Sequence, residues 1–184
     1  QRQMCIRDSG KRVREFCRDN YGVLWIGTED GGLNRFNLNT KEFSFFAPSA
    51  GFTNIHGLCL VDDKLWVGTF SKGLKIIDTR TGTVLKTYQK NSSPRSLIDN
   101  SIFAICRTAT GDIYLGTMFG LVKYNKQSDD FDRIPELNGK FVYDIKEDSG
   151  GNIWLATYAN GAYCYNVNDR KWKNYVHDLS LIHI

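Results

Sequence analysis

The stretch from Asp19 to Asn37, DNYGVLWIGTEDGGLNRFN, decides the fold. It contains two short runs rich in leucine, isoleucine, valine and aromatic residues, which favour β-strands. Glycine, asparagine and aspartate separate and flank these runs, and they favour tight turns, with Gly22 and Gly32 able to supply a positive φ. The stretch therefore predicts a turn, a strand, a second turn and a second strand.

The same pattern recurs three more times along the chain. The later copies begin at Asp62 (DDKLWVGTFSKGLKIID), Thr108 (TATGDIYLGTMFGLVKYN) and Asp148 (DSGGNIWLATYANGAYCYN). Each copy places an aromatic anchor, a small residue and a threonine at matching positions, and the anchors lie 41, 48 and 40 residues apart. The matching positions are Trp25, Trp66, Tyr114 and Trp154; Gly27, Gly68, Gly116 and Ala156; and Thr28, Thr69, Thr117 and Thr157.

Each copy predicts four short antiparallel strands, A to D, with the aromatic anchor in strand B. Strand A is expected at 13–17, 55–61, 102–106 and 142–145. A four-stranded meander of about 40–45 residues is the unit of a β-propeller blade. One such sheet cannot bury both faces alone, so blades stack against their neighbours. We expect the aromatic anchors to fill the space between blades and the small residues to leave room for their rings.

The sequence thus predicts an all-β propeller fragment of four tandem blades, arranged as an open arc or as a ring of four. An open arc would expose an apolar blade face at each end. Residues 1–9 and 179–184 belong to no repeat, resemble translated sequencing-adapter DNA, and are interpreted as non-native terminal segments. The four blades are expected at approximately 10–53, 54–99, 100–139 and 140–178.

Composition excludes several classes of protein. The 24 Lys and Arg residues are interleaved with 20 Asp and Glu, and no block of like charge predicts nucleic-acid binding. No apolar run reaches the roughly 18–20 residues of a membrane helix, and no signal peptide is visible. Cys17, Cys59 and Cys106 occupy one repeat position, where the fourth copy has Lys146. Without metal-ligand spacing we interpret them as half-buried thiols, and we expect no metal or cofactor.

A ligand site is expected where the B–C and D–A loops of a propeller meet near its axis. Aromatic side chains interleaved with polar ones suit a sugar, because the rings stack on apolar faces and the polar groups bond to hydroxyls. The candidates in the B–C loops are Glu29, Asp30, Phe70, Ser71, Lys72, Met118, Phe119, Tyr158 and Asn160. Those in the D–A loops are Asn54, His56, Asn100 and Asn138.

The motif D-x-x-G-x-[LI]-W-[IL]-G-T-x-x-G-L-x-x-[YF]-N resembles the two-component regulator propeller repeat. It stands almost intact from Asp19 to Asn37, and from Asp148 to Asn166 with Ala156 and Ala162 in place of glycine and leucine. The resemblance implies the periplasmic or extracytoplasmic sensor region of a hybrid histidine kinase. It further implies non-catalytic recognition of an oligosaccharide, with the remaining blades and the downstream signalling domains as partners.

Two other functions remain open from the sequence. The stretch DTRTGTVLKTY from Asp78 resembles the repeats of propellers that act as protein-binding scaffolds. The D-x-x-G-x-x-W turns resemble the Asp-boxes of sialidase-like enzymes, but no arginine triad and no pair of catalytic carboxylates stands out.

Overall fold

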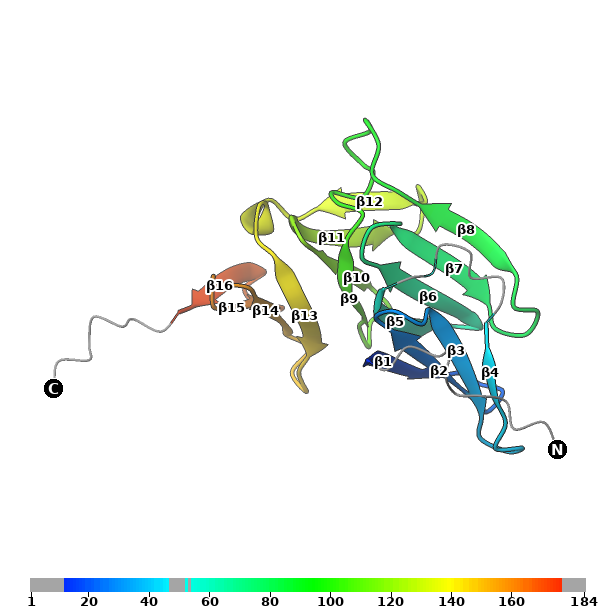
Figure 1. Ribbon diagram of the computed structural model, residues 1–184. Helices are drawn as coiled ribbons and strands as arrows, with labels where there is room; N and C mark the ends of the chain where they lie inside the picture. Colours follow the sequence, from blue (N-terminus) through cyan, green and yellow to red (C-terminus); the bar gives the residue numbers. More distant parts are fainter. Residues whose placement is uncertain (1–11, 47–51, 53, 177–184) are drawn as a thin grey trace, which may run out of the picture.

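A computed structural model describes residues 12–46, 52 and 54–176 (Figure 1). Within these residues the chain forms antiparallel β-sheets and one short 3-10 helix, Pro135–Leu137. The two segments predicted to be non-native, 1–9 and 179–184, lie outside the described residues.

Each of the four repeats forms one four-stranded sheet, or blade, and the prediction of tandem antiparallel blades is confirmed. Every sheet orders its strands as the chain does, which is an up-and-down meander. Blade one contains β1 (Val13–Arg18), β2 (Val23–Thr28), β3 (Leu33–Asn37) and β4 (Phe43–Phe45); blade two contains β5 (Ile55–Val61), β6 (Lys64–Thr69), β7 (Leu74–Asp78) and β8 (Val84–Tyr88). Blade three contains β9 (Ile102–Arg107), β10 (Ile113–Thr117), β11 (Gly120–Asn125) and β12 (Asp130–Arg133); blade four contains β13 (Val142–Glu147), β14 (Ile153–Thr157), β15 (Ala162–Asn166) and β16 (Lys171–Tyr175).

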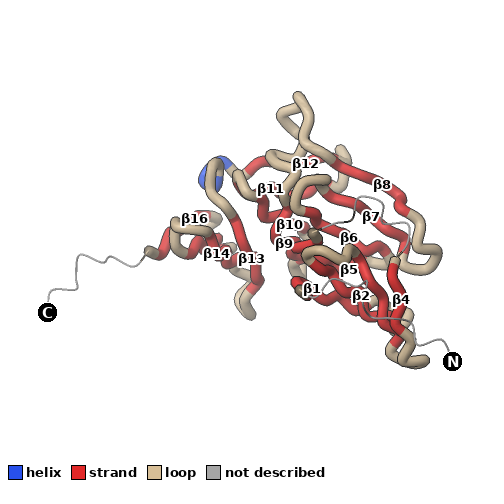
Figure 2. The backbone as a smooth tube through the Cα atoms, in the orientation of Figure 1, coloured by secondary structure: helices blue, strands red, loops and turns tan. Residues whose placement is uncertain are grey.

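The blades are arranged as an open arc around their A strands. The A strands β1, β5, β9 and β13 each contact the next one, and the sheets fan outward from them (Figure 2). Among the described residues, no contact of comparable extent leads from blade four back to blade one. Of the two arrangements that the sequence left open, the structure therefore has the arc and not the ring of four.

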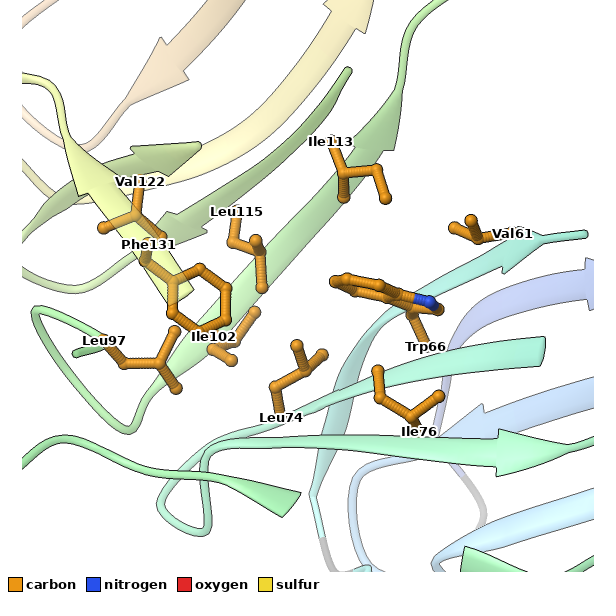
Figure 3. Close-up of a cluster of buried hydrophobic side chains, with 10 residues drawn as sticks. All are labelled: Val61, Trp66, Leu74, Ile76, Leu97, Ile102, Ile113, Leu115, Val122 and Phe131. Atoms are coloured by element: carbon orange, nitrogen blue, oxygen red, sulfur yellow. The ribbon is translucent and has the colours of Figure 1, made fainter. Parts of the chain in front are cut away.

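The hydrophobic core consists of three clusters, each between two consecutive blades. Trp66 on β6 packs with Leu74 of its own blade and with Ile113 of blade three (Figure 3). Trp25 fills the same place between blades one and two, and Tyr114 between blades three and four. These three anchors are buried, which confirms that they fill the space between blades. The fourth anchor, Trp154, is 38% exposed, so the prediction does not hold for blade four within the described residues.

The glycine that follows each anchor makes room for the next blade rather than for the aromatic ring. A Cβ atom added to this glycine would lie within 2.8 Å of the first residue of the next strand A, closer than side-chain atoms approach one another. The three pairs are Gly27 with Ile55 at 2.6 Å, Gly68 with Ile102 at 2.7 Å, and Gly116 with Val142 at 2.8 Å. The prediction that these glycines leave space for the anchor ring is wrong, because a β-branched side chain of the neighbouring blade occupies it.

A buried aspartate holds the A–B turn and the aromatic anchor of blade one together. The Oδ1 atom of Asp19 accepts hydrogen bonds from the backbone N–H groups of Tyr21 (2.9 Å) and Val23 (2.8 Å). Its Oδ2 atom accepts one from the indole Nε1–H of Trp25 at 2.9 Å. The carboxylate thus shapes the turn and orients the ring that packs against blade two.

Blade four repeats this arrangement, and in blade three a threonine takes the place of the aspartate in the turn. Asp148 accepts a hydrogen bond from Trp154 Nε1–H at 2.8 Å, and this bond with those from Asn152 lowers the pKa of Asp148 to about 2. In blade three the hydroxyl of Thr108 accepts from the N–H of Asp112 (3.0 Å). These aspartates therefore have a structural role in the turns.

Replacing Gly68 by alanine tests the spacing between blades two and three. We expect Gly68→Ala to lower the free energy of unfolding by about 2 kcal/mol, because the added methyl group overpacks a buried contact. Urea unfolding measures the change. The control, Ser149→Ala, changes an exposed residue of the A–B turn in blade four without adding an atom to a buried contact, and it should change stability by less than about 0.5 kcal/mol. Equal stability of the two variants would contradict the close approach.

Replacing Asp19 by asparagine tests the link between turn and anchor. An amide has only one acceptor oxygen, so in either orientation its N–H₂ group faces a donor, either the indole N–H of Trp25 or the backbone N–H groups of the turn. We therefore expect Asp19→Asn to lower the free energy of unfolding by about 2 kcal/mol. The control is Asp30→Asn, which changes an exposed aspartate and should leave the unfolding midpoint unchanged. Chemical denaturation followed by circular dichroism gives both values, and an unaffected Asp19→Asn variant would refute the structural role of the carboxylate.

Candidate functional site

The threonine that ends strand B in every repeat fixes the shape of the B–C loop that follows it. The hydroxyl of Thr69 donates to the carbonyl oxygen of Gly73 (2.8 Å) and accepts from the N–H of Lys72 (2.9 Å). Gly73 has φ +75°, and a side chain there would collide with the carbonyl oxygen of Tyr88. The Gly-Thr-x-x-x-Gly pattern therefore builds a tight loop of defined shape.

Backbone hydrogen bonds then join each B–C loop to the start of strand A in the same blade. The N–H of Phe70 donates to the carbonyl oxygen of Asn54, and the N–H of Tyr158 donates to that of Phe141, both at 2.9 Å. Blades one and three have the same bond, from Glu29 to Arg12 (2.9 Å) and from Met118 to Ser101 (3.1 Å). The B–C loops and the ends of the D–A loops thus share one face, as predicted; we call it the inner face.

A β-bulge at the second residue of strand A recurs in all four blades. The pairing of strand A with strand B skips this residue in every sheet, so that its side chain leaves the regular alternation. The bulged residues are Arg14, His56, Phe103 and Tyr143. Because all four A strands lie side by side and each bulge stands at the start of its strand, the bulges bring these side chains to the inner face.

Six ring side chains of blades two to four gather on the inner face. We call them the aromatic cluster: His56, Phe70, Phe103, Phe141, Tyr143 and Tyr158. Phe103 lies at its centre, with its ring centroid 4.7 Å from that of His56 and 4.4 Å from that of Phe141. Phe103 is buried, whereas Phe70, Tyr143 and Tyr158 are exposed. The cluster therefore has a buried floor and accessible rings above it.

The corresponding positions of blade one carry charges instead of rings. Arg14 Nη2 lies 2.8 Å from Glu29 Oε2, and Arg12 Nη1 lies 3.5 Å from Glu29 Oε1. Desolvation raises the pKa of Glu29 while the bonds and charges of Arg14 and Arg12 lower it, and the net shift is downward. Two guanidinium groups thus share one ionised carboxylate beside the aromatic cluster.

His56 lies where the charged and aromatic parts of the inner face meet. Its Nε2 atom is 2.9 Å from Oδ1 of Asn54, and its ring packs on Phe70 and Phe103. Burial lowers the pKa of His56, and the positive charge of Arg14 lowers it further, against a smaller opposing effect of Glu29. The imidazole is therefore neutral at pH 7 and can exchange hydrogen bonds with a ligand.

The structure brings together only some of the residues chosen from the sequence. Phe70 and Tyr158 belong to the aromatic cluster, and Glu29 belongs to the charged group of blade one. The remaining candidates lie on the same loops outside both groups: Asp30, Ser71, Lys72 and Phe119 are exposed, and Met118 and Asn160 are half-buried. Of the D–A loop candidates, Asn54 and His56 join the site, Asn100 binds the N–H of Lys90 through Oδ1 (2.7 Å), and Asn138 is exposed.

Sequence reasoning missed five residues of this face. They are Arg12, Arg14, Phe103, Phe141 and Tyr143. Aligning the second residue of each strand A would have put Arg14, Phe103 and Tyr143 in one column. Their position on the inner face depends on the bulge in each strand A. An alternating pattern of apolar and polar residues does not predict where such a bulge occurs.

The thiols of Cys17, Cys59 and Cys106, which share one position of strand A, remain protonated at neutral pH. Burial is the main cause that raises the pKa of Cys17 to about 12 and that of Cys106 to about 11, and it also raises the pKa of Cys59. Protonated thiols are poor nucleophiles and poor metal ligands. Among the described residues, no three or more His, Cys, Asp or Glu side chains are grouped to hold a metal ion. No helix in the described part of the chain is long and apolar enough to cross a membrane.

Comparison with known proteins relates the repeat to a family. The family model of the two-component regulator propeller matches residues 8–30, 96–119 and 136–159. A protein of Formosa agariphila named histidine kinase P4 is 33% identical over 169 residues, which cover 85% of this chain and 12% of that protein. The chain thus spans about one eighth of the length of this relative.

Solved structures share the fold. The chain superposes on a protein of B. thetaiotaomicron described as the extracellular domain of a hybrid two-component system, with a TM-score of 0.77 and 22% identity over 92% of this chain and 25% of that one. Virginiamycin B lyase from Staphylococcus aureus matches with a TM-score of 0.68 and 16% identity over 91% of this chain and 56% of that one. The same fold thus occurs in a lyase, and it does not decide function.

Meandering sheets that pack face to face around adjacent A strands define this class of protein as a β-propeller. The Asp-x-x-Gly-x-x-Trp turn, the Gly-Thr loop and the match to the family model then define which kind of propeller repeat it contains. Three segments of the chain match the repeat of the two-component regulator propeller, and the chain is a propeller built from repeats of that family.

The titration of His56 tests the electrostatics of the inner face. We expect its folded-state pKa, followed by NMR of the ring protons, to lie below the ordinary 6.5, and Arg14→Gln to raise it. Because the unfolded chain then binds more protons near pH 6, stability should fall as the pH drops below 6.5. Lys171→Gln, on the outermost strand of blade four, is the control and should not move the titration. A His56 pKa above 6.5 would contradict the structure.

Proposed function

We propose that this chain is part of the extracytoplasmic sensor propeller of a hybrid two-component histidine kinase. In this proposal its inner face recognises an oligosaccharide without catalysing a reaction. The family, the histidine kinase relative and the extracellular domain of similar fold support the sensor role. The aromatic cluster is the observation that carries the ligand assignment.

The cluster has the properties that a sugar site requires. Exposed rings offer apolar surfaces on which the C–H faces of pyranose rings stack, and Phe103 beneath them keeps the platform rigid. Polar groups at its border can bond to hydroxyls, among them Asn54 and neutral His56. The rings span three blades, which favours a ligand of several sugar units over a monosaccharide.

The charges on this face argue against glycoside hydrolysis. A glycosidase uses two carboxyl groups, one of which is a general acid with a raised pKa. Glu29 is held ionised by Arg14 and Arg12, and its pKa is lowered, so it is unsuited to donate a proton. Asp19 and Asp148 hold the A–B turns at the opposite ends of the strands. Binding without turnover is therefore the function that we propose.

The ligand would act on the remaining blades and on signalling domains of a longer protein. Because the aromatic cluster crosses the packing between blades two, three and four, a ligand seated on it would contact all three blades. Differential affinity for two blade arrangements is what allows a ligand to shift a signalling equilibrium.

Oligosaccharide binding can be tested with the chain itself. A printed array of neutral and acidic oligosaccharides identifies ligands, and calorimetry with the best of them measures affinity. We expect Tyr158→Ala and Tyr143→Ala each to weaken binding at least tenfold, because each removes a stacking surface of the cluster. Tyr21→Ala, which removes an exposed tyrosine from an A–B turn, is the matched control and should bind normally.

Two results would count against this proposal. Unchanged affinity in both cluster variants would remove the inner face as the sugar site. Release of reducing ends from the bound oligosaccharide would show an enzyme. If the array shows no binding and the same variants instead lose a protein partner of the kinase, the face serves as a protein-binding scaffold.

A further inference from the structure

We infer that the ligand of the inner face carries an anionic group, a carboxylate or a sulfate, which Arg14 binds while neighbouring sugar rings stack on the aromatic cluster. The ligand is then an acidic oligosaccharide rather than a neutral one. This inference rests on the proposed sugar binding and narrows it to one chemical class.

The four bulged residues of strand A form a row across the inner face. They occupy the same position of adjacent A strands, and each A strand contacts the next one. The order along the row is therefore Arg14, His56, Phe103 and Tyr143. A ligand that lies along this row meets a guanidinium group at one end and aromatic rings at the other.

The charges at the Arg14 end of the row do not balance. Arg14 Nη2 lies 2.8 Å from Glu29 Oε2, and Arg12 Nη1 lies 3.5 Å from Glu29 Oε1. Two guanidinium groups thus face one carboxylate, which leaves one positive charge in excess within the group. The side chains of Arg14 and Glu29 are 34% and 25% exposed, so water screens their charges less than it screens those of fully exposed groups. This excess charge attracts an anion.

The guanidinium of Arg14 has hydrogen-bond donors to offer to a second anion. It carries several N–H groups, and within the described part of the chain one of them bonds to another side chain, that of Glu29. The planar group can bind two oxygen atoms of a carboxylate, or of a tetrahedral anion such as sulfate, through parallel hydrogen bonds. A ligand anion can therefore bind Arg14 beside Glu29 or in its place.

The blade does not need an ion pair at this place. In the other blades the two equivalent positions, the bulged residue and the first residue of the B–C loop, carry no charged pair. They are His56 with Phe70, Phe103 with Met118, and Tyr143 with Tyr158. All four B–C loops nevertheless bond to the start of strand A through the backbone. The fold therefore does not require the charges of Arg14 and Glu29, which favours a role for them in binding.

His56 links the charged end of the row to the rings. The charges of Arg14 and Glu29 both act on it, and its own ring packs on Phe70 and Phe103. An anion bound to Arg14 offsets the positive charge that lowers the pKa of His56. Binding of an acidic ligand should therefore raise this pKa, whereas a neutral ligand only buries the imidazole further and should lower it.

Matched pairs of oligosaccharides test the anionic group directly. The array carries tetrasaccharides of polygalacturonate, alginate, hyaluronan and chondroitin, each beside its carboxyl-reduced neutral form, and sulfated carrageenan tetrasaccharides beside their desulfated forms. We expect the acidic member of the pair that binds best to bind about tenfold more tightly than its neutral counterpart, because hydrogen bonds to charged groups are the stronger ones. Loss of the preference on carboxyl reduction identifies a carboxylate, and loss on desulfation identifies a sulfate.

Variants of the Arg14–Glu29 pair should change this preference in opposite directions. In calorimetry with the chosen pair of sugars, Arg14→Gln should lower the affinity for the acidic member about tenfold and change that for the neutral member by less than about twofold. Arg14→Lys, which keeps the charge but loses the planar fork, should lose less. Glu29→Gln removes the competing carboxylate and should raise the affinity for the acidic member about threefold, a gain that unfolding cannot produce.

The matched controls lie at the opposite end of the A strands. Arg107 Nη2 is 3.2 Å from Asp62 Oδ1, so Arg107→Gln and Asp62→Asn make the same changes of charge away from the inner face and should leave both affinities unchanged.

The outcomes separate this inference from the proposed function. Equal binding of both members of every pair, or an unchanged preference in Arg14→Gln, would overturn the acidic ligand and leave neutral sugar binding in place. No binding of any oligosaccharide would remove the proposed function and the acidic ligand with it. NMR of the His56 ring protons gives a further readout, since a pKa that falls when the acidic member binds would place the anion away from Arg14.

Discussion

The packing of each aromatic anchor against the next strand A is the contact on which this structure depends. A single four-stranded sheet has two faces and no core of its own, so its stability comes from its neighbours. The anchor supplies the apolar area, and the glycine two residues later lets a β-branched side chain of the next blade approach. In blade one the A–B turn and the anchor form one unit, because Asp19 accepts hydrogen bonds from both the turn and Trp25.

The inner face is a consequence of this packing. Stacked blades place the A strands side by side, and a bulge in each strand turns one side chain toward the loops. Different residues occupy the equivalent positions, so the face is charged in blade one, at Arg14, and aromatic in blade four, at Tyr143. A site composed in this way can change its ligand by substitutions that leave the blade packing intact, because the bulged residues lie outside the three hydrophobic clusters between the blades.

The same packing rule explains the ends of the arc. Blades one and four each keep a face that the internal blades bury, and Trp154 and Phe16 remain open there. The fourth blade also departs from the repeat at Ala156 and Lys146, both on this open face. The rule thus places the exposed apolar surface of the arc at blades one and four. In the similar histidine kinase the aligned region is 12% of the protein.

The sequence by itself determined the blades. Strand order, the A strands, the turns and the burial of the anchors Trp25, Trp66 and Tyr114 follow from a local pattern of apolar residues, glycines and threonines, and each was predicted. Tertiary structure decided which atoms fill the space between blades, that the arc stays open, and which side chains form the inner face. Ile55 meets Gly27, and Phe103 meets Phe141, across separations that no local pattern encodes. The bulges also break the alternation on which prediction of side-chain direction depends.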